Sequence, residues 1–233
     1  MAQNDNLLLA SFSPNDLASL QPHLKPIKLE QAHLLFDPGD AVEYVYFPTG
    51  AVISLVLALS TGEMIESAMV GKDGMVGASA ALDDKISTIR AIVQLGGSTL
   101  VCDSRVLKGA ALQSVSLLSR IIRHEQSLMA QVQQSAACLA AHHTEARLCR
   151  WLLRARDLSG SDTLHFTQEF LAEMLGVQRG SVTVVAHTLQ QAGMIKYARG
   201  KIQILNLEGM REIACECYEA TRAQIDAMLE HRT

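Results

Sequence analysis

The chain has 233 residues, which is enough for two domains of ordinary size, each with its own core. It carries 20 Lys and Arg against 24 Asp and Glu, a formal net charge of −4, so any attraction to a polyanion must come from a local basic patch. No apolar run is long enough to cross a bilayer, and no basic region precedes Leu7-Leu8-Leu9, so we expect a cytoplasmic protein without a membrane partner.

The first half of the chain reads as a series of short strands. Between residues 25 and 102, runs rich in β-formers alternate with turn signals such as Asp37-Pro38-Gly39-Asp40 and Gly96-Gly97. Regular spacing of this kind favours a closed β-roll or sandwich whose apolar interior forms a core and often a cavity. The predicted strands are residues 27–29, 34–36, 44–47, 51–59, 64–70, 89–95 and 100–102.

After Asp103 the apolar period changes to that of a helix. A short helix over Ser104–Gln113 leads into a long one that begins near Val115 and keeps an apolar stripe for about six turns. Packing within the chain is one explanation, but the stripe is too long for a small roll to cover. We therefore predict a seam with a second copy of the chain. Its expected interface residues are Leu118, Ile121, Ile122, Met129, Val132 and Leu139.

A further helix over residues 144–158 and a short polar linker lead to a helix-turn-helix pattern. Thr167 is placed to cap a first helix, and Gly176 supplies the turn. A second helix follows over residues 178–191, with an apolar inner face and a polar outer face, and Gly193 ends it. Two apolar-alternating runs, residues 194–197 and 201–205, then predict a hairpin, and a last amphipathic helix is expected over residues 207–229.

Helix, glycine turn, polar-faced helix and basic hairpin in that order indicate a winged helix-turn-helix, which places its second helix in a DNA major groove. All four cations of residues 167–203 fall on the second helix or the hairpin, where phosphates would lie. The plainer interpretation is a structural helix pair that never touches DNA. The candidate DNA-binding residues are Thr167, Gln178, Arg179, Ser181, Thr183, His187, Arg199 and Lys201.

The cysteines give no familiar metal pattern. Cys102, Cys138, Cys149, Cys215 and Cys217 form no CxxC pair and no Cys/His set with zinc spacing. Cys215 and Cys217 are two residues apart, a poor separation for joint ligation on a helix because the two side chains point to different faces. We therefore interpret all five as reduced, mostly buried thiols rather than a redox site, and the pair His142-His143 as packed or solvated rather than metal-ligating. No metal or cofactor is expected.

The order of a β-roll, a long helix and a C-terminal winged helix resembles the Crp/Fnr family of bacterial transcription regulators over nearly the whole chain. The best-matched segment is Phe166-Thr-Gln-Glu-Phe-Leu-Ala-Glu-Met-Leu-Gly-Val-Gln-Arg-Gly-Ser-Val, which is similar to the helix-turn-helix signature of that family. The resemblance implies that Arg179 and Ser181 face DNA. Asp37-Pro38-Gly39-Asp40 and residues 44–50 also resemble the roll of the family.

Three departures from the family pattern matter. The cyclic-nucleotide binders place Gly-Glu and, some ten residues later, Arg-Ser/Thr-Ala in a phosphate-binding cassette. Here the matching stretches are Gly74-Met75-Val76-Gly77 and Lys85-Ile86-Ser87-Thr88-Ile89-Arg90. Met75 cannot accept a hydrogen bond from a ribose hydroxyl, and Arg90 is out of register with the phosphate-binding arginine of the cassette. Members that sense oxygen carry N-terminal cysteines, and no cysteine precedes Cys102. Gly180 stands where many members have a glutamate that reads cytosine.

We therefore expect an α+β protein with a β-roll over residues 1–113, a dimerisation helix over 114–141 and a winged helix-turn-helix domain over 142–233. The leading hypothesis is a homodimeric regulator that binds inverted-repeat sites in double-stranded DNA without cyclic AMP, and that contacts RNA polymerase if it is an activator. The alternative is a ligand-binding regulatory module that acts through protein partners without DNA. No residue constellation supports an enzyme.

Overall fold

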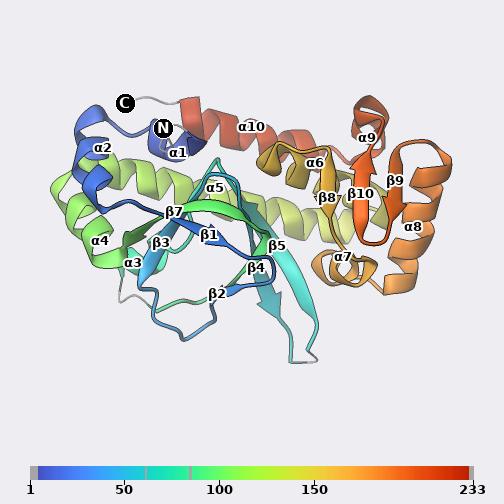
Figure 1. The fold of residues 1–233 in the computed structure, drawn as a ribbon, viewed down its shortest axis with the longest axis horizontal. Coiled ribbons are helices and arrows are strands. Elements are labelled where there is room, and N and C mark those ends of the chain that lie inside the picture. Colours follow the sequence, from blue (N-terminus) through green and yellow to red (C-terminus); the bar gives the residue numbers. More distant parts are fainter. Residues whose placement is uncertain (1–4, 61, 84–85, 231–233) are drawn as a thin grey trace.

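The computed structural model describes residues 5–60, 62–83 and 86–230, so Lys85 of the cassette lies outside the described residues. The N-terminal roll and a C-terminal helical domain with a small sheet lie one after the other along the longest axis, and a long central helix runs beside them in the same direction (Figure 1). This arrangement confirms the predicted α+β class.

The roll consists of two antiparallel sheets. Three strands pair in the order β1-β7-β3, and four pair in the order β2-β6-β4-β5. The bounds are β1 (Lys25–Leu29), β2 (Leu34–Phe36), β3 (Tyr44–Pro48), β4 (Val52–Ala58), β5 (Met64–Val70), β6 (Arg90–Leu95) and β7 (Gly97–Asp103). These bounds confirm all seven strands expected from the turn and β-former pattern, within a few residues at each end.

Three short helices at the N-terminus and one inside the roll were not expected from the sequence. They are α1 (Leu7–Ala10), α2 (Pro14–Leu20), the 3-10 turn η2 (Gln21–His23) and α3 (Ala78–Leu82). The buried Asn6 side chain donates to the carbonyls of Pro48 and Gly74 at 2.8 and 2.9 Å, and thereby fastens the start of α1 to the roll. Helices this short carry too few turns to show an apolar period.

The central helix is attached to the roll by two buried side chains on one face. α4 (Ser104–Gln113) leads into α5 (Val115–Ala141), as predicted. Nε2 of His124 accepts from the backbone amide of Met75 at 3.1 Å, and Oε1 of Gln131 accepts from the amide of Met69 at 2.7 Å. Because an unpaired buried amide is costly, these bonds fix the rotation of α5 against the roll.

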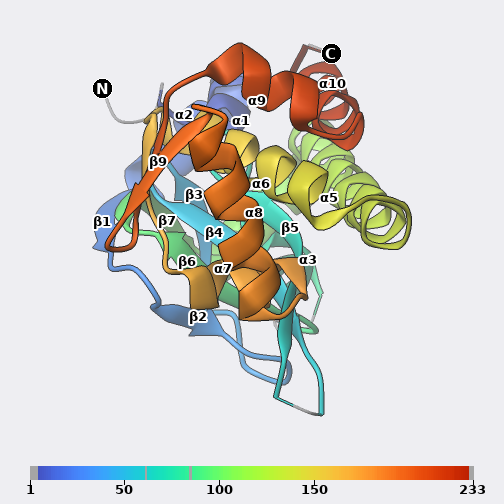
Figure 2. The ribbon, with the colours of Figure 1, turned by 90° about the vertical axis from the view of Figure 1, so that its right-hand side faces the viewer.

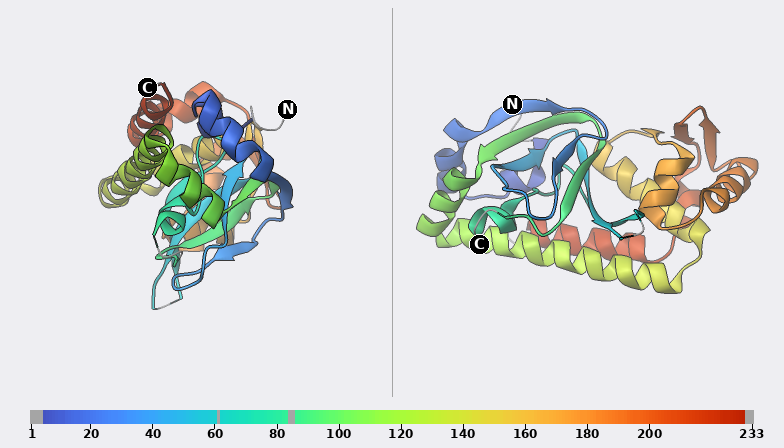
Figure 3. Two further views of the ribbon diagram at one scale, coloured as in Figure 1. Left: turned by 90° about the vertical axis from the view of Figure 1, so that its left-hand side faces the viewer. Right: turned by 90° about the horizontal axis from the view of Figure 1, so that it is seen from below.

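The C-terminal half confirms the helix-turn-helix and its hairpin. It contains α6 (Thr144–Ser159), β8 (Thr163–His165), α7 (Gln168–Leu175), α8 (Arg179–Gln191), β9 (Ile195–Ala198), β10 (Lys201–Ile204), α9 (Leu207–Ile213) and α10 (Cys217–Glu230). β8 completes a three-stranded sheet in the order β8-β10-β9 and was not predicted. The prediction of a single last helix was wrong, because residues 214–216 divide it into α9 and α10. α10 runs back along α5 (Figure 3).

The roll and the C-terminal half share a packed interface. Val52, Val56 and Met69 of the roll belong to the same buried cluster as Trp151 of α6 and Leu171 of α7. Arg154 of α6 forms an ion pair with Asp73 of the roll at 2.6 Å. Gly176, at the turn of the helix-turn-helix, is so close to β5 that a Cβ on it would lie 3.2 Å from the Ile65 side chain.

A carboxyl group lies inside this interface. Oγ of Ser54 lies 2.5 Å from Oε2 of Glu66 and 2.7 Å from Oε1 of Gln94. One hydroxyl proton cannot serve both acceptors, and protonation of Glu66 removes the conflict because Glu66 then donates to Ser54. Burial raises the pKa of Glu66 to about 7, against the opposing hydrogen bond from Ser54 and the charge of Arg150.

Replacing Glu66 with Gln should therefore stabilise the fold in a pH-dependent way. A carboxyl whose pKa is raised by folding destabilises the native state progressively as pH rises from its unfolded pKa, about 4.5, to about 7. The free energy of unfolding of the variant should equal that of the parent near pH 4.5 and should exceed it by up to about 3 kcal/mol at pH 8. Urea unfolding at several pH values measures the difference. An equal difference at every pH, or the same trend for the exposed control Glu173→Gln, would contradict this assignment.

Candidate nucleic-acid interface

The helix-turn-helix is built by local signals that the sequence contains. Oγ1 of Thr167 accepts from the amide of Phe170 at 3.1 Å and so caps α7. Gly176 ends α7 in the left-handed conformation, with φ of +60°. The chain then turns through Val177 and Gln178, and α8 begins at Arg179. Thr167 is therefore a structural cap as well as an exposed candidate for DNA contact.

An aromatic cluster supports the two helices from below. Trp151 of α6 meets Phe166 edge to face with ring centroids 4.8 Å apart. Phe166 in turn stacks on Phe170 of α7 at 5.4 Å. The inner face of α8 closes the same core with Val182 and Leu189. This shared core holds α7 and α8 together.

The outer face of α8 is uncovered and polar apart from the exposed Val184, and the helix stands at the end of the molecule (Figure 2). Every candidate DNA-binding residue of the turn and helix is exposed: Gln178, Arg179, Ser181, Thr183 and His187. Thr183 donates to Gln168 of α7 at 2.8 Å, and Arg179 forms an ion pair with Glu169 at 3.3 Å. Both side chains of that pair are 65% exposed, so it is worth no more than about 1 kcal/mol and can give way to a stronger partner.

The hairpin after α8 presents two cations beside this face. Arg199 and Gly200 occupy the turn between β9 and β10 with φ of +50° and +74°, the signs that a two-residue type I′ turn requires. The Tyr197 hydroxyl donates to the carbonyl of Phe166 at 2.9 Å and fastens the hairpin to the start of α7. Arg199 and Lys201 remain exposed. A groove of about 290 Å³ lies between this hairpin, the start of α7 and Arg179.

Among the described residues of the roll, the two cassette positions singled out in the sequence are already engaged within the protein. Met75 is completely buried in the core below α4 and α5. Arg90 on β6 holds both carboxylate oxygens of Asp37, one of them at 2.8 Å, so its guanidinium already has a partner. The cavity beside the cassette region, lined by Phe36, Gly77 and Ser87 among others, measures about 140 Å³. Ligand pockets commonly measure about 300–1,000 Å³.

The central helix leaves part of its apolar stripe uncovered. Ile122 and Met129 are 49% and 59% exposed, and Leu139 is also exposed. Leu118 and Val132 are half-buried against the core of their own chain. Ile121 is 0% exposed and packs inside that core, so it is not available to a second copy and the prediction that placed it in the seam was wrong.

The cysteines are all free and buried, as expected. Cys102 and Cys149 lie in large apolar cores. The argument that Cys215 and Cys217 face different ways was wrong, because Cys215 precedes α10 and does not share a helix with Cys217. Their side chains lie beside Cys138 and His142, a grouping that sequence spacing did not indicate. Among the described residues, no helix is long and apolar enough to cross a membrane.

Comparison with known proteins agrees with this geometry. Residues 146–213 match the Crp-like helix-turn-helix domain family. The transcriptional regulator SdrP of Thermus thermophilus is 31% identical over 104 residues, which is 42% of this chain and 52% of that protein. The match thus spans about half the length of this curated relative.

Solved structures share the fold over most of the chain. A Crp/Fnr-family regulator from Eubacterium rectale superposes with a TM-score of 0.70 at 16% identity, covering 90% of this chain and 98% of that one. FixK2 from Bradyrhizobium japonicum superposes with a TM-score of 0.70 at 14% identity, covering 82% of this chain and 98% of FixK2. A CRP-family regulator from Thermus thermophilus superposes with a TM-score of 0.68 at 21% identity, covering 81% of this chain and 96% of that one.

Proposed function

Because residues 146–213 match the Crp-like helix-turn-helix domain family and the fold matches that of solved Crp/Fnr regulators, we propose that this chain is a Crp/Fnr-type transcription regulator. In this proposal it binds double-stranded DNA in a sequence-specific manner, with α8 in the major groove. The observation that carries the proposal is the exposed polar face of α8, flanked by the cationic hairpin β9–β10. Arg179 lies in the first turn of α8, the part of a recognition helix that reaches base edges. Its guanidinium fork suits O6 and N7 of guanine, whereas Arg199 and Lys201 suit phosphates.

The functional unit is a homodimer in this proposal. The exposed positions Val115, Ile122, Met129 and Ala136 of α5 recur every seven residues. A second row at 118, 125, 132 and 139 lies beside them, and three of its four residues are apolar. Two such rows at this spacing make the a and d positions of a two-stranded seam. A second copy of α5 would cover apolar surface that a single chain leaves in water.

A two-fold dimer implies inverted-repeat sites. Two recognition helices related by the dimer axis meet half-sites whose centres lie about one helical turn, roughly 10 base pairs, apart. The roll serves as a sensor for something other than cyclic AMP, or as a structural support. RNA polymerase is a further partner if the protein activates transcription.

Replacing Arg179 with Ala should weaken the specific site far more than random DNA, by about 1–3 kcal/mol per half-site. Lys201→Ala should weaken both similarly, and it should reduce the slope of log K against log salt by about 1 for each phosphate that is no longer neutralised. Fluorescence anisotropy on a site selected from random DNA, at several salt concentrations, measures both effects.

Glu169→Ala is the matched control for this experiment, because it removes the ion pair but leaves the arginine. If the role of Arg179 is only to hold Glu169, the two variants should lose affinity equally. An unchanged ratio of specific to random binding in Arg179→Ala would show that α8 is not the reader. Absence of any retained DNA at low salt would instead favour a module that acts through protein partners.

Ile122→Asp combined with Met129→Asp should yield monomers. The two carboxylates would lie unpaired inside the seam, which is costly to desolvate. Sedimentation or light scattering at low micromolar concentration measures the oligomeric state. The matched control Ala223→Asp with Gln224→Asp adds the same charge at exposed positions of α10 and should leave the dimer intact. A double variant of α5 that still sediments as a dimer would disprove the seam.

Cyclic AMP should not bind the roll. Met75 offers no acceptor for a ribose hydroxyl, and a phosphate would have to displace Asp37 from Arg90. Calorimetric titration of the purified protein should show no saturable heat up to millimolar nucleotide. A dissociation constant in the micromolar range or tighter would overturn this expectation.

A further inference from the structure

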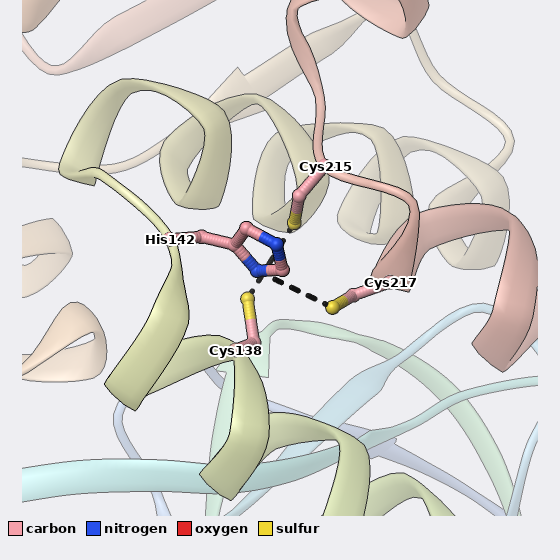
Figure 4. Close-up of side chains that lie close together, drawn as sticks. All are labelled: Cys138, His142, Cys215 and Cys217. Carbon is pink, nitrogen blue, oxygen red and sulfur yellow. Dashed lines mark hydrogen bonds between the residues drawn. The ribbon is translucent and has the colours of Figure 1, made fainter.

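Four side chains that ligate soft metals converge where α5 ends and α10 begins. Cys138 lies in the last turn of α5, and His142 is the residue that ends this helix. Cys215 lies between α9 and α10, and Cys217 is the first residue of α10. The four side chains point toward one common centre (Figure 4).

Two of the distances between these side chains equal the edges of a tetrahedral metal site, and the whole set is only slightly wider. Sγ of Cys138 lies 3.5 Å from Sγ of Cys215, and Sγ of Cys217 lies 3.6 Å from Nδ1 of His142. All four ligand atoms lie within 4.8 Å of one another. Tetrahedral zinc with Zn–S of about 2.3 Å and Zn–N of about 2.0–2.1 Å places its ligand atoms about 3.5–3.8 Å apart. A disulfide would bring the two sulfurs to about 2.05 Å.

The donor set selects the metal. Three thiolates and one imidazole suit zinc, whereas magnesium and calcium need oxygen ligands. A two-iron cluster divides its ligands between two metal ions and needs more room than four atoms around one centre provide. Four protein ligands leave no open position for water or substrate, which is the arrangement of a structural zinc site.

Neighbouring groups orient and balance the ligands. Nε2 of His142 lies 3.2 Å from a carboxylate oxygen of Glu216, so the tautomer that donates to Glu216 leaves the Nδ1 lone pair facing Cys217. Gln134 donates to Sγ of Cys217 at 3.0 Å. The positive charge of Arg150 acts on Cys138. Zinc with three thiolates carries one net negative charge, which such a cation offsets.

Ordinary packing does not account for the group. Cys138, Cys215 and Cys217 form a small buried cluster of their own, with only Ala146 packed against it among the described hydrophobic residues. Cys102 and Cys149, by contrast, are single cysteines among many aliphatic side chains. This cluster has too little aliphatic surface around it to serve as an apolar core. Its three thiols and one imidazole do, however, make a complete set of four metal ligands.

We propose that Cys138, His142, Cys215 and Cys217 bind one zinc ion, which fastens the start of α10 to the end of α5. The site lies where the chain passes from the central helix into the DNA-binding half. It holds α10 in place along α5, where Ile225 and Met228 of α10 enter the core formed with the N-terminal helices. This inference does not depend on DNA binding, and its test uses none.

Metal analysis of the full-length protein tests the proposal. Protein purified under reducing conditions should contain about one zinc per chain by mass spectrometry, and cobalt substitution should give the intense visible bands of a tetrahedral thiolate site. Cys215→Ala and Cys217→Ala should each reduce bound zinc at least about tenfold, while the buried control Cys102→Ala should retain it. A chelator should lower the Tm of the parent and of Cys102→Ala but not that of Cys217→Ala.

His142→Gln provides a second variant for the case that a cysteine variant does not fold, because its side chain is 22% exposed and lies outside the main cores. It should fold, bind cobalt more weakly and lose the spectral contribution of the imidazole. Three results would overturn the proposal. They are iron with acid-labile sulfide in the protein, a Cys138–Cys215 disulfide in the freshly purified chain, or failure of the reduced parent to take up zinc or cobalt.

Discussion

The attachment of α5 to the roll determines where every other functional element lies. His124 and Gln131 are seven residues apart on one face of the helix, and each receives a buried backbone amide of the roll. These bonds fix the rotation of α5 about its axis, because turning the helix would leave both buried amides without a hydrogen-bond acceptor. The face that carries Ile122 and Met129 must therefore point away from the roll. The orientation of the proposed seam is a consequence of two polar contacts on the other side of the helix.

The same helix connects the proposed DNA-reading and metal-binding regions. Its last turn contributes Cys138 and His142, and α6 then carries Trp151 beneath α7 and α8. α10 returns along α5, so the end of the chain stabilises the element on which the dimer proposal rests. The proposed recognition helix, the proposed seam and the cysteine cluster are thus parts of one packed unit rather than separate modules joined by linkers.

The sequence predicted the elements whose signals are local. Thr167 and Gly176 cap α7, and the exposure of Arg179 followed from the inner position of Val182 and Leu189. Arg179 also forms an exposed ion pair with Glu169, ten positions earlier in the chain. β8 was missed because Thr163-Leu164-His165 directly follows the polar linker, and only its pairing with β10 shows that it is a strand. The break between α9 and α10 was missed because neither Gly nor Pro marks residues 214–216. The cysteine cluster joins residues 77 positions apart, which spacing cannot reveal.

The contact between Gly176 and Ile65 has a consequence for how far apart two recognition helices can stand. The turn between α7 and α8 rests directly on β5, so closely that a methyl group on Gly176 would press against the Ile65 side chain. In a two-fold dimer, the position of each copy of α8, and hence the distance between the two copies, would then depend on the hairpin β4–β5 of the roll. A change of side-chain volume at residue 65 would shift this separation. If the separation no longer matched the spacing of the half-sites, the DNA would have to bend for both helices to bind. In the proposed dimer, the distance between the two half-sites would therefore depend partly on side chains of the roll.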